Sequence, residues 1–321
     1  MRDEACTEHI DAMVFNRTTP VIPTHEHTPL ISKPIFVIGC NRSGTTLLFE
    51  TLSRHPSLWS LYVEAQDVWY KHYPIHSEDG DRVTECPSVL VRNELHSSLY
   101  SMAHNKECLK DRTVWKFVPR KLMQRPVVNV YKTPPIRLVE KTPANCLRIP
   151  FLARLFPDAK FIFVVRQGED VVSSLMEGWK VWSRTEHTTW SFNKWHYIVP
   201  PGWQRWVGRQ LVEICAFQWI EANTTAWADL NEHCQGRYLL VRHEDLLAEP
   251  QAEYETIRAF CELPPSKYFT AQLDSIKSRV YTTGGSAPRL GKWKDLHYTE
   301  ITSIRPLLEP LNKQFYPHGG T

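Results

Sequence analysis

The strongest constraint on the fold comes from residues 34–52, where a short apolar run is followed by a loop between two glycines and an apolar helix start. Residues 35–38 (Ile-Phe-Val-Ile) are too few and too branched for a good helix, so they predict a buried strand. Gly39 and Gly44 have the spacing of a phosphate-binding loop, in which backbone N–H groups converge on an anion at a helix N-terminus. The unit therefore predicts a site for a phosphate-like group.

The cation of this loop is not in the position that a nucleotide triphosphatase would use. Thr45 follows the second glycine, where such an enzyme carries lysine, and Arg42 lies inside the loop instead. This pattern favours a donor other than ATP or GTP.

A second strand-to-helix unit lies at residues 156–175. Its apolar residues 161–165 predict a strand, Arg166 follows at the carboxyl end, and Ser174 comes about a turn and a half into the predicted helix. In open parallel sheets the ligand lies beyond the carboxyl ends of the strands. Arg166 and Ser174 can therefore face one phosphate, and the two loops can hold the two ends of one nucleotide.

Both units resemble motifs of one family. Residues 42–46 (Arg-Ser-Gly-Thr-Thr), after a buried strand, resemble the 5′-phosphosulfate loop of sulfotransferases that use 3′-phosphoadenosine 5′-phosphosulfate (PAPS), in the branch with arginine in that loop. A guanidinium and a ring of amides suit a phosphosulfate, which carries less charge than a triphosphate and needs no bridging magnesium. Residues 166–174 resemble the 3′-phosphate motif Arg-x-Pro-x-Asp-x-x-x-Ser, with Gly168 in place of proline.

The resemblance implies a P-loop-like sulfotransferase fold, an α/β domain with a central parallel sheet flanked by helices. It also implies PAPS as co-substrate, with no metal. The residues expected to bind this donor are Arg42, Ser43, Gly44, Thr45, Thr46, Arg166 and Ser174.

Three further segments match the family in order. Residues 140–143 (Glu-Lys-Thr-Pro) resemble the segment before the 3′-phosphate strand in protein-tyrosine and glycosaminoglycan sulfotransferases, and residues 238–246 resemble a late strand and turn. Residues 284–294 resemble the C-terminal loop that closes over the nucleotide, although the Arg-Lys-Gly of the cytosolic branch is absent. In this loop Arg289 and Lys294 are candidates for phosphate contacts.

Composition supports one enzyme domain. The 321 residues contain no Gly/Ser linker, repeat or low-complexity run, so we expect a lead-in at residues 1–33 and one domain at 34–321.

The net charge of only +3 argues against a general polyanion binder, and no nucleic-acid partner is expected. No stretch approaches the roughly 20 apolar residues of a membrane span. The 8 cysteines lack a framework spacing, so we expect mostly free thiols and a cytoplasmic location. His25 and His27 lack a third ligand, and no metal is expected there.

Sulfuryl transfer requires a base for the acceptor and cations for the departing phosphate. Arg42 supplies one cation from the loop, and the resemblance places Lys141 near the phosphosulfate. Glu64 is the best candidate for the base, because it follows the first helix and its His-Pro exit by less than ten residues. The tyrosine-sulfating branch has its base glutamate at a similar distance.

Other candidates for the base remain open. Asp67 and His72 follow Glu64 within about two turns. The cytosolic branch uses a histidine well downstream of the loop, and His96 or His104 could take that role.

Most of the 12 tryptophans lie between positions 179 and 227. Trp219 and Trp227 lie on a helix-periodic stretch with Val207, so core packing is expected for both. Residues 181–206 lack a clean period and are expected to cover the site as an insertion. Aromatic walls are typical of small-molecule pockets. The residues that could line an acceptor site are Trp182, Trp190, Trp195 and Trp203.

The expected acceptor is a hydroxyl on a moderately apolar small molecule or on a lipid-like or carrier-tethered chain. Two other functions share the strand-loop-helix unit. A P-loop kinase should show lysine after Gly44 and a magnesium-binding aspartate, and neither is evident. A non-catalytic nucleotide- or glycan-binding protein would need no base at the mouth of the loop.

Overall fold

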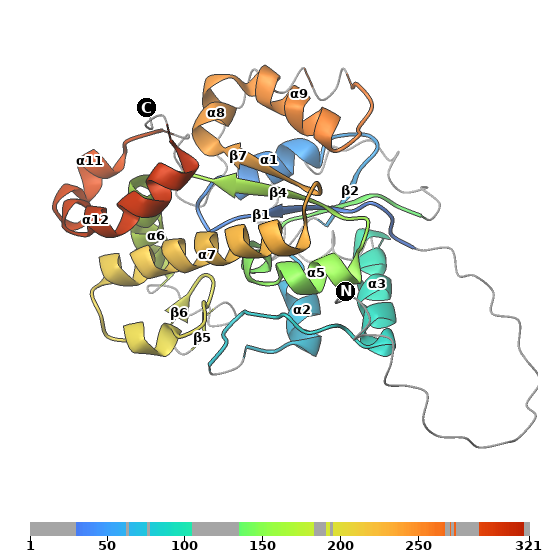
Figure 1. Cartoon of the computed structure of the whole chain (residues 1–321), viewed down its shortest axis with the longest axis horizontal. Coiled ribbons are helices and arrows are strands. Elements are labelled where there is room, and N and C mark those ends of the chain that lie inside the picture. Colours follow the sequence, from blue (N-terminus) through green and yellow to red (C-terminus); the bar gives the residue numbers. More distant parts are fainter. Residues whose placement is uncertain are drawn as a thin grey trace, which may run out of the picture.

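A computed structural model describes the chain over residues 30–61, 64–75, 78–104, 135–182, 191–192, 195–266, 270, 273 and 289–317. Its centre is a sheet of five parallel strands in the order β2-β3-β1-β4-β7 (Figure 1). The strand bounds are β1 Ile35–Ile38, β2 Trp59–Ser60, β3 Leu138–Glu140, β4 Lys160–Val165 and β7 Tyr238–Arg242. The predicted α/β domain with a parallel sheet is confirmed.

Helices cover both faces of the sheet, so its strands are apolar on both sides. Along the chain they are α1 Thr45–Leu52, α2 Gln66–His72, α3 Val89–His104, η4 Pro143–Leu147, α5 Ile149–Leu155, α6 Gly168–Trp182, η6 Trp203–Trp206, α7 Leu211–His233, α8 His243–Ala248, α9 Pro250–Phe260, α11 Trp293–Leu296 and α12 Tyr298–Phe315. A short antiparallel pair, β5 Ser191–Phe192 and β6 Trp195–His196, lies outside the main sheet.

Alternate residues of β1 face different halves of the core. Ile35 and Val37 pack in the cluster that includes α1 and α9, whereas Phe36 and Ile38 pack in the larger cluster under α5, α6, α7 and α12. Figure 1 shows the same division, with α1, α8 and α9 on one side of the sheet and α5 and α7 on the other. Burial on both faces holds β1 rigidly, and with it the loop that follows.

Helix α7 lies against the sheet as expected, but it begins later than the apolar period suggests. Trp219 is fully buried, and Trp227 packs against the same core. Val207 is exposed outside the helix, because Gly208 takes a left-handed φ of 83° and Gln210 forms a capping box with Glu213. The cap therefore overrides the periodicity at this end.

Within the described ranges, no helix combines the length and apolar character required to cross a bilayer. The cysteines there are free thiols, namely Cys40, Cys86, Cys146, Cys215, Cys234 and Cys261.

Candidate active site

The candidate residues converge where the parallel strands end. Because β1 lies between β3 and β4, its carboxyl end has that of β3 on one side and that of β4 on the other. Lys141 therefore flanks the glycine-bounded loop on one side, and Arg166 flanks it on the other. The chain also changes direction across the sheet at β1, and such switch points are where open α/β sheets bind ligands.

The loop after β1 has a tightly curled backbone. Gly39 has a φ of 149°, Arg42 of 71° and Gly44 of 96°, and the Ser43 N–H donates to the Cys40 carbonyl at 3.1 Å. A left-handed conformation is costly for arginine, and such strain is concentrated at functional sites. Thr45 and Thr46 follow as the first residues of α1, so their N–H groups belong to the free helix N-terminus.

Gly44 has no room for a side chain. A Cβ atom there would lie 2.2 Å from Nδ1 of His243, which is buried at the start of α8. Burial and the nearby Arg166 hold the pKa of His243 well below its usual value, so the imidazole under the loop is neutral. The sequence analysis did not single out this residue, whose only local signal is its position directly after β7.

Gly44→Ala is expected to lower the free energy of unfolding by about 1–3 kcal/mol, through the left-handed φ and the contact with His243. Gly236→Ala is the matched control, because Gly236 also has a positive φ of 71° but nothing lies within 4 Å of its Cβ position. Denaturant unfolding measures both variants. An equal loss in the two would show that His243 does not restrict the loop.

The arginine of each strand-to-helix unit contacts a residue of the other unit. Nε of Arg42 donates to Oγ of Ser174 at 3.0 Å, and Nη1 of Arg166 lies 3.4 Å from the Arg42 carbonyl oxygen. Asp170 pairs with Arg166 at 3.6 Å. The structure thus brings together Arg42, Arg166 and Ser174, as the sequence predicts.

Four buried polar atoms in this region have no hydrogen-bond partner among the described residues. Two are donors, Oγ of Ser43 in the loop and Nε of Arg166, and the other two are Oδ1 of Asp170 and Nδ1 of His243. A buried donor without a partner is costly, and native structures usually satisfy it with a ligand or water. A hydroxyl and a guanidinium N–H at the end of a parallel sheet fit an anionic ligand such as a phosphate.

Glu64 and Lys141 form an ion pair at the side of the loop next to β3. Lys141 is 8% exposed, whereas the Glu64 side chain remains 35% exposed and accessible. The backbone beside Glu64 is also fixed, because the Ala65 N–H donates to Oγ1 of Thr142 at 3.0 Å. The hydroxyl of Thr142 in turn donates to the carboxyl of Glu140. Strand β3 therefore positions both members of the pair.

Glu140 is a buried carboxyl that the sequence analysis did not assign to the site. It accepts hydrogen bonds from Thr142 and, at 2.8 Å, from Nδ2 of Asn145. Burial raises its pKa to about 7, and the charge of Glu64 acts in the same direction, while Thr142 and Lys141 oppose the shift. Glu140 therefore binds a proton in the folded protein well above the ordinary glutamate pKa.

The raised pKa predicts a specific pH dependence of stability. Between about pH 4.5 and 7 the folded state binds the Glu140 proton and the unfolded state does not, so stability falls as the pH rises through this window. We expect a loss of about 2 kcal/mol between pH 5 and pH 7. Glu140→Gln should remove this component. Urea unfolding of both proteins across this range measures it, and identical slopes would contradict the assignment.

The alternative candidates for the base have different surroundings in the structure. Nε2 of His96 lies 3.3 Å from the Leu155 carbonyl, and its ring packs at a tilt against Phe156, just before the amino end of β4. His96 therefore packs at the end of the sheet away from the glycine-bounded loop, and the choice of base stays a prediction. His72 lies 3.5 Å from Glu94, and Asp67 is exposed on α2. The side chain of His104 lies outside the described residues.

The C-terminal loop reaches the site through its backbone. Nη2 of Arg166 lies 3.4 Å from the Arg289 carbonyl oxygen, and the Gly291 N–H donates to Asp170 at 3.0 Å.

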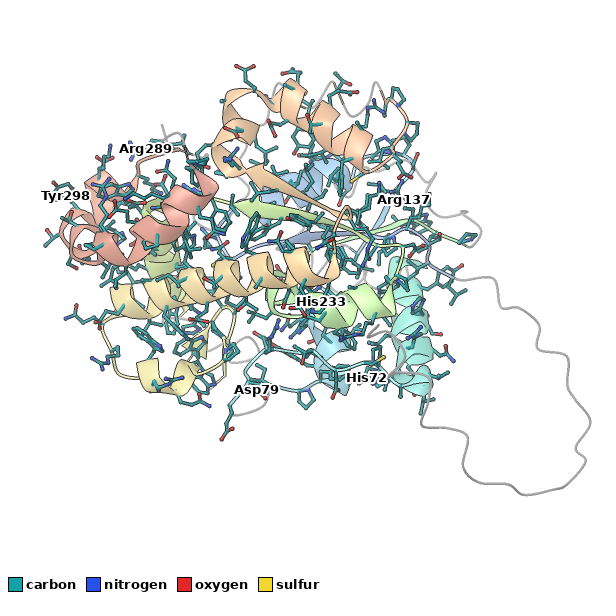
Figure 2. All side chains as sticks on the ribbon, viewed as in Figure 1. His72, Asp79, Arg137, His233, Arg289 and Tyr298 are labelled. Carbon is teal, nitrogen blue, oxygen red and sulfur yellow. The ribbon has the colours of Figure 1, made fainter. Side chains whose placement is uncertain are left out.

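The Arg289 guanidinium pairs with Asp295 and is largely exposed, and Lys294 lies exposed near the ring of Trp293. Figure 2 shows Arg289 beside the C-terminal helices, at the opposite end of the sheet from Arg137, which precedes β3. Phosphate contacts by Arg289 and Lys294 stay a prediction.

Two tryptophans of the 181–206 segment, Trp195 and Trp203, are buried, and Trp206 is partly buried beside them. Trp195 and Trp203 are 3% and 4% exposed, their rings lie 5.3 Å apart, and both belong to a small core with Phe217. Trp195 and Trp203 therefore contribute to the core that holds this segment against Phe217 of α7, and their contact with an acceptor stays a prediction. Trp190 and the side chain of Trp182 lie outside the described residues.

The same segment contacts the glycine-bounded loop after β1 directly. The Ile198 N–H donates to Oδ1 of Asn41 at 3.2 Å, and the Ile198 carbonyl accepts from Trp195 and Gln218. The segment is thus placed beside the loop by a contact that local sequence patterns do not reveal.

Comparisons with known proteins identify the family. A family model described as the sulfotransferase family matches residues 34–267. Protein-tyrosine sulfotransferase 1 of Rattus norvegicus is 27% identical over 154 residues, which are 47% of this chain and 35% of that protein. The Danio rerio protein of the same name is 24% identical over 252 residues, 78% of this chain and 57% of that protein. The chain therefore spans between about a third and just over half of the length of these relatives.

Solved sulfotransferase structures are also similar over most of the chain. One is the sulfotransferase domain from the curacin biosynthetic pathway, with 18% identity, a TM-score of 0.45 and coverage of 87% of this chain and 98% of that one. Another is sulfotransferase STF1 from Mycobacterium tuberculosis, with 19% identity, a TM-score of 0.46 and coverage of 88% and 78%. The family model alone covers more than half of the sequence. The chain belongs to the sulfotransferase family.

Proposed function

We propose that the protein transfers a sulfuryl group from PAPS to a hydroxyl group of an acceptor. The observation that carries this proposal is the meeting of the two strand-to-helix units at one edge of the sheet. Arg42 of the first unit contacts Ser174 of the second, and each unit also has a buried donor without a partner among the described residues, on Ser43 and on Arg166. Two linked anion sites suit a nucleotide with phosphates at both ends.

The residues around the loop can perform each part of the transfer. Glu64 accepts the proton of the acceptor hydroxyl as its oxygen forms a bond to sulfur. The bond between sulfur and the bridging oxygen breaks, and its electron pair stays on the departing 5′-phosphate. Arg42 and Lys141 stabilise the negative charge that develops there. Thr45 and Thr46 contribute N–H donors at the helix N-terminus.

A labelling experiment tests the transfer. The protein is incubated with an acceptor extract and either PAPS labelled in its sulfuryl group or ATP labelled in its γ-phosphate. Label from PAPS should appear in an acceptor, whereas label from ATP should not. Transfer from ATP would favour the kinase alternative, and binding of PAP, the desulfated product, without any transfer or donor hydrolysis would favour a non-catalytic protein.

For the acceptor, we propose a hydroxyl on a moderately apolar small molecule or on a lipid-like or carrier-tethered chain. The support is the tryptophan-rich 181–206 segment, which contacts the loop through Asn41 and Ile198. The names of the relatives favour a second candidate, the phenolic hydroxyl of a tyrosine in a protein. Mass spectrometry of the labelled extract separates the two, because the added SO₃ group is found either on a small molecule or on a tyrosine peptide.

A further inference from the structure

The turn that follows Arg166 is held from outside the matched family region. The Gly168 N–H donates to Oδ1 of Asn312 on α12 at 3.0 Å. Nδ2 of the same asparagine donates to Oε2 of Glu169 at 2.8 Å. Asn312 thus fixes two successive residues of the turn with one side chain, and it lies beyond residue 267, where the family match ends.

The neighbouring peptide of the turn is held in the same way. The Gln167 N–H donates to Oε1 of Glu244 at 3.1 Å, and Oε2 of Glu244 accepts the hydroxyl of Tyr316 at 2.5 Å. Glu244 and Tyr316 are both buried, so neither position is free to change without leaving a polar group unpaired. Both backbone N–H groups directly after Arg166 therefore donate to side chains that the C-terminal segment supplies or orients.

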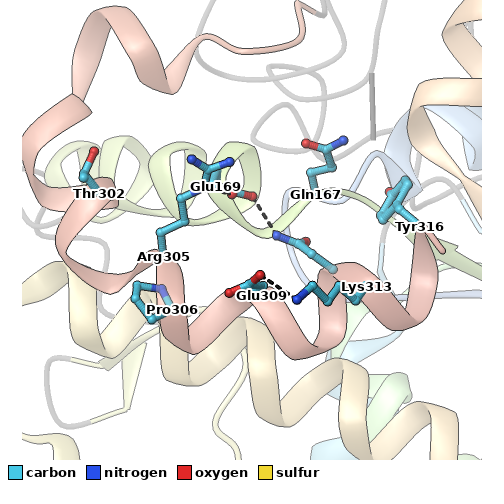
Figure 3. A pocket seen from close by; sticks show the side chains of 9 residues that line it. Gln167, Glu169, Thr302, Arg305, Pro306, Glu309, Lys313 and Tyr316 are labelled. Carbon is cyan, nitrogen blue, oxygen red and sulfur yellow. Dashed lines mark hydrogen bonds and ion pairs between the residues drawn. The ribbon is translucent and has the colours of Figure 1, made fainter. Parts of the chain in front are cut away.

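These contacts line the floor of a polar hollow of about 590 Å³ between α12 and the start of α6. Figure 3 shows Gln167 and Glu169 on one side of it, with Arg305, Glu309 and Lys313 of α12 and Tyr316, directly after α12, on the other. The space around Gly168 is also narrow, since a Cβ atom there would lie 3.0 Å from Trp219 and 3.2 Å from Leu308. The turn is wedged between α7 and α12.

The orientation of the Arg166 side chain depends on this turn. The Arg166 carbonyl accepts the indole N–H of Trp219 at 3.2 Å, and its guanidinium points back toward the Arg42 carbonyl and Asp170. Glycine at position 168 leaves the backbone more conformational freedom than most residues would, so contacts from elsewhere must restrict it. Asn312 and Tyr316 supply this restriction.

We propose that Asn312 and Tyr316 are positioning residues of the donor site, which orient Arg166 toward the 3′-phosphate of the nucleotide through the turn at 167–169. This inference rests on the proposed function, because it assigns α12 a part in recognising that donor. It also predicts which of the two phosphates is bound less tightly when a contact is removed. Loss of either contact should weaken recognition of the 3′-phosphate and spare recognition of the 5′-phosphate, which depends on the loop at 39–44.

Calorimetric binding of two nucleotides tests the proposal. Adenosine 3′,5′-bisphosphate and 5′-AMP share the adenosine and the 5′-phosphate and differ only in the 3′-phosphate. Asn312→Leu, which keeps the volume, should reduce the affinity ratio of the two nucleotides about tenfold, and Tyr316→Phe, which keeps the ring, about threefold. The affinity for 5′-AMP should stay within about twofold of the wild type. Lys313→Ala is the matched control, because Lys313 lies in the same hollow and pairs only with the exposed Glu309 in the described structure.

The outcomes separate the two hypotheses. A wild-type protein that binds both nucleotides equally would overturn the proposed function itself. A wild type that prefers the bisphosphate, with the same ratio in both variants, would overturn the positioning role alone. An equal loss of affinity for both nucleotides would show that α12 acts only on the stability of the fold. If Asn312→Leu fails to fold in a thermal-unfolding control, the ratio for Tyr316→Phe decides.

Discussion

Glu64→Gln is expected to reduce turnover by a factor of about 10²–10⁴ while nucleotide affinity stays close to that of the wild type. Glutamine keeps the shape of the side chain and can still accept a hydrogen bond from Lys141, but it cannot take a proton from the acceptor. The affected step is therefore deprotonation, and donor binding should be spared. Steady-state rates with saturating PAPS, together with calorimetric binding of PAP, measure the two effects separately.

Two variants make this prediction specific. Asp67→Asn removes a carboxylate from the exposed side of α2 and should leave the rate nearly unchanged. Lys141→Ala should lower turnover and also weaken donor binding, because the ammonium is expected to contact the group that is transferred. If Glu64→Gln retains most of its activity while Asp67→Asn or His104→Ala abolishes it, another residue is the base.

Arg166→Ala is expected to weaken PAP binding by about 2–4 kcal/mol, through loss of a charge-assisted contact with the 3′-phosphate. The guanidinium is largely buried and has an unpartnered Nε, so it can bind an anion with little competition from water. At a PAP concentration one hundred times its dissociation constant, the wild type should be stabilised by about 2.7 kcal/mol. Thermal unfolding with and without PAP measures this stabilisation in both proteins.

The control is Lys313→Ala, which removes an exposed cation on α12 that pairs with the exposed Glu309 and not with the turn. It should leave the stabilisation by PAP near the wild-type value. ATP lacks a 3′-phosphate and should stabilise the wild type much less than PAP does. Equal thermal shifts with the two nucleotides would contradict the assignment of Arg166.

Local sequence was sufficient for the parts of the site that one strand-to-helix unit encodes. Gly39, Arg42 and Gly44 lie in one short loop, and Arg166 and Ser174 lie at the end of one strand and in the helix that follows. Their residue types and spacing reflect short-range geometry, namely left-handed backbone at the glycines and free N–H groups at the helix start. The order of the two units also predicted that they would share one edge of a parallel sheet.

Tertiary structure decided which distant residues complete the site. His96 was a reasonable candidate for the base from its type and position, but α3 places it against Phe156, just before the amino end of β4. Glu64 is placed through Thr142 on a different segment. No local pattern specifies such pairings, because they arise when separate elements pack together.

The same reason explains the residues that the sequence analysis missed. His243 lies under Gly44 because β7 ends beside β4, and Asn312 meets Gly168 because α12 packs across α6 and α7. Neither residue stands out from its neighbours in the sequence. Each acquires its role from the part of the site that it contacts after folding. Local residue patterns were thus enough to predict the two strand-to-helix loops. The packing of helices on the sheet determined how those loops are held and which carboxylate stands beside them, because burial leaves few positions at which polar groups can find partners.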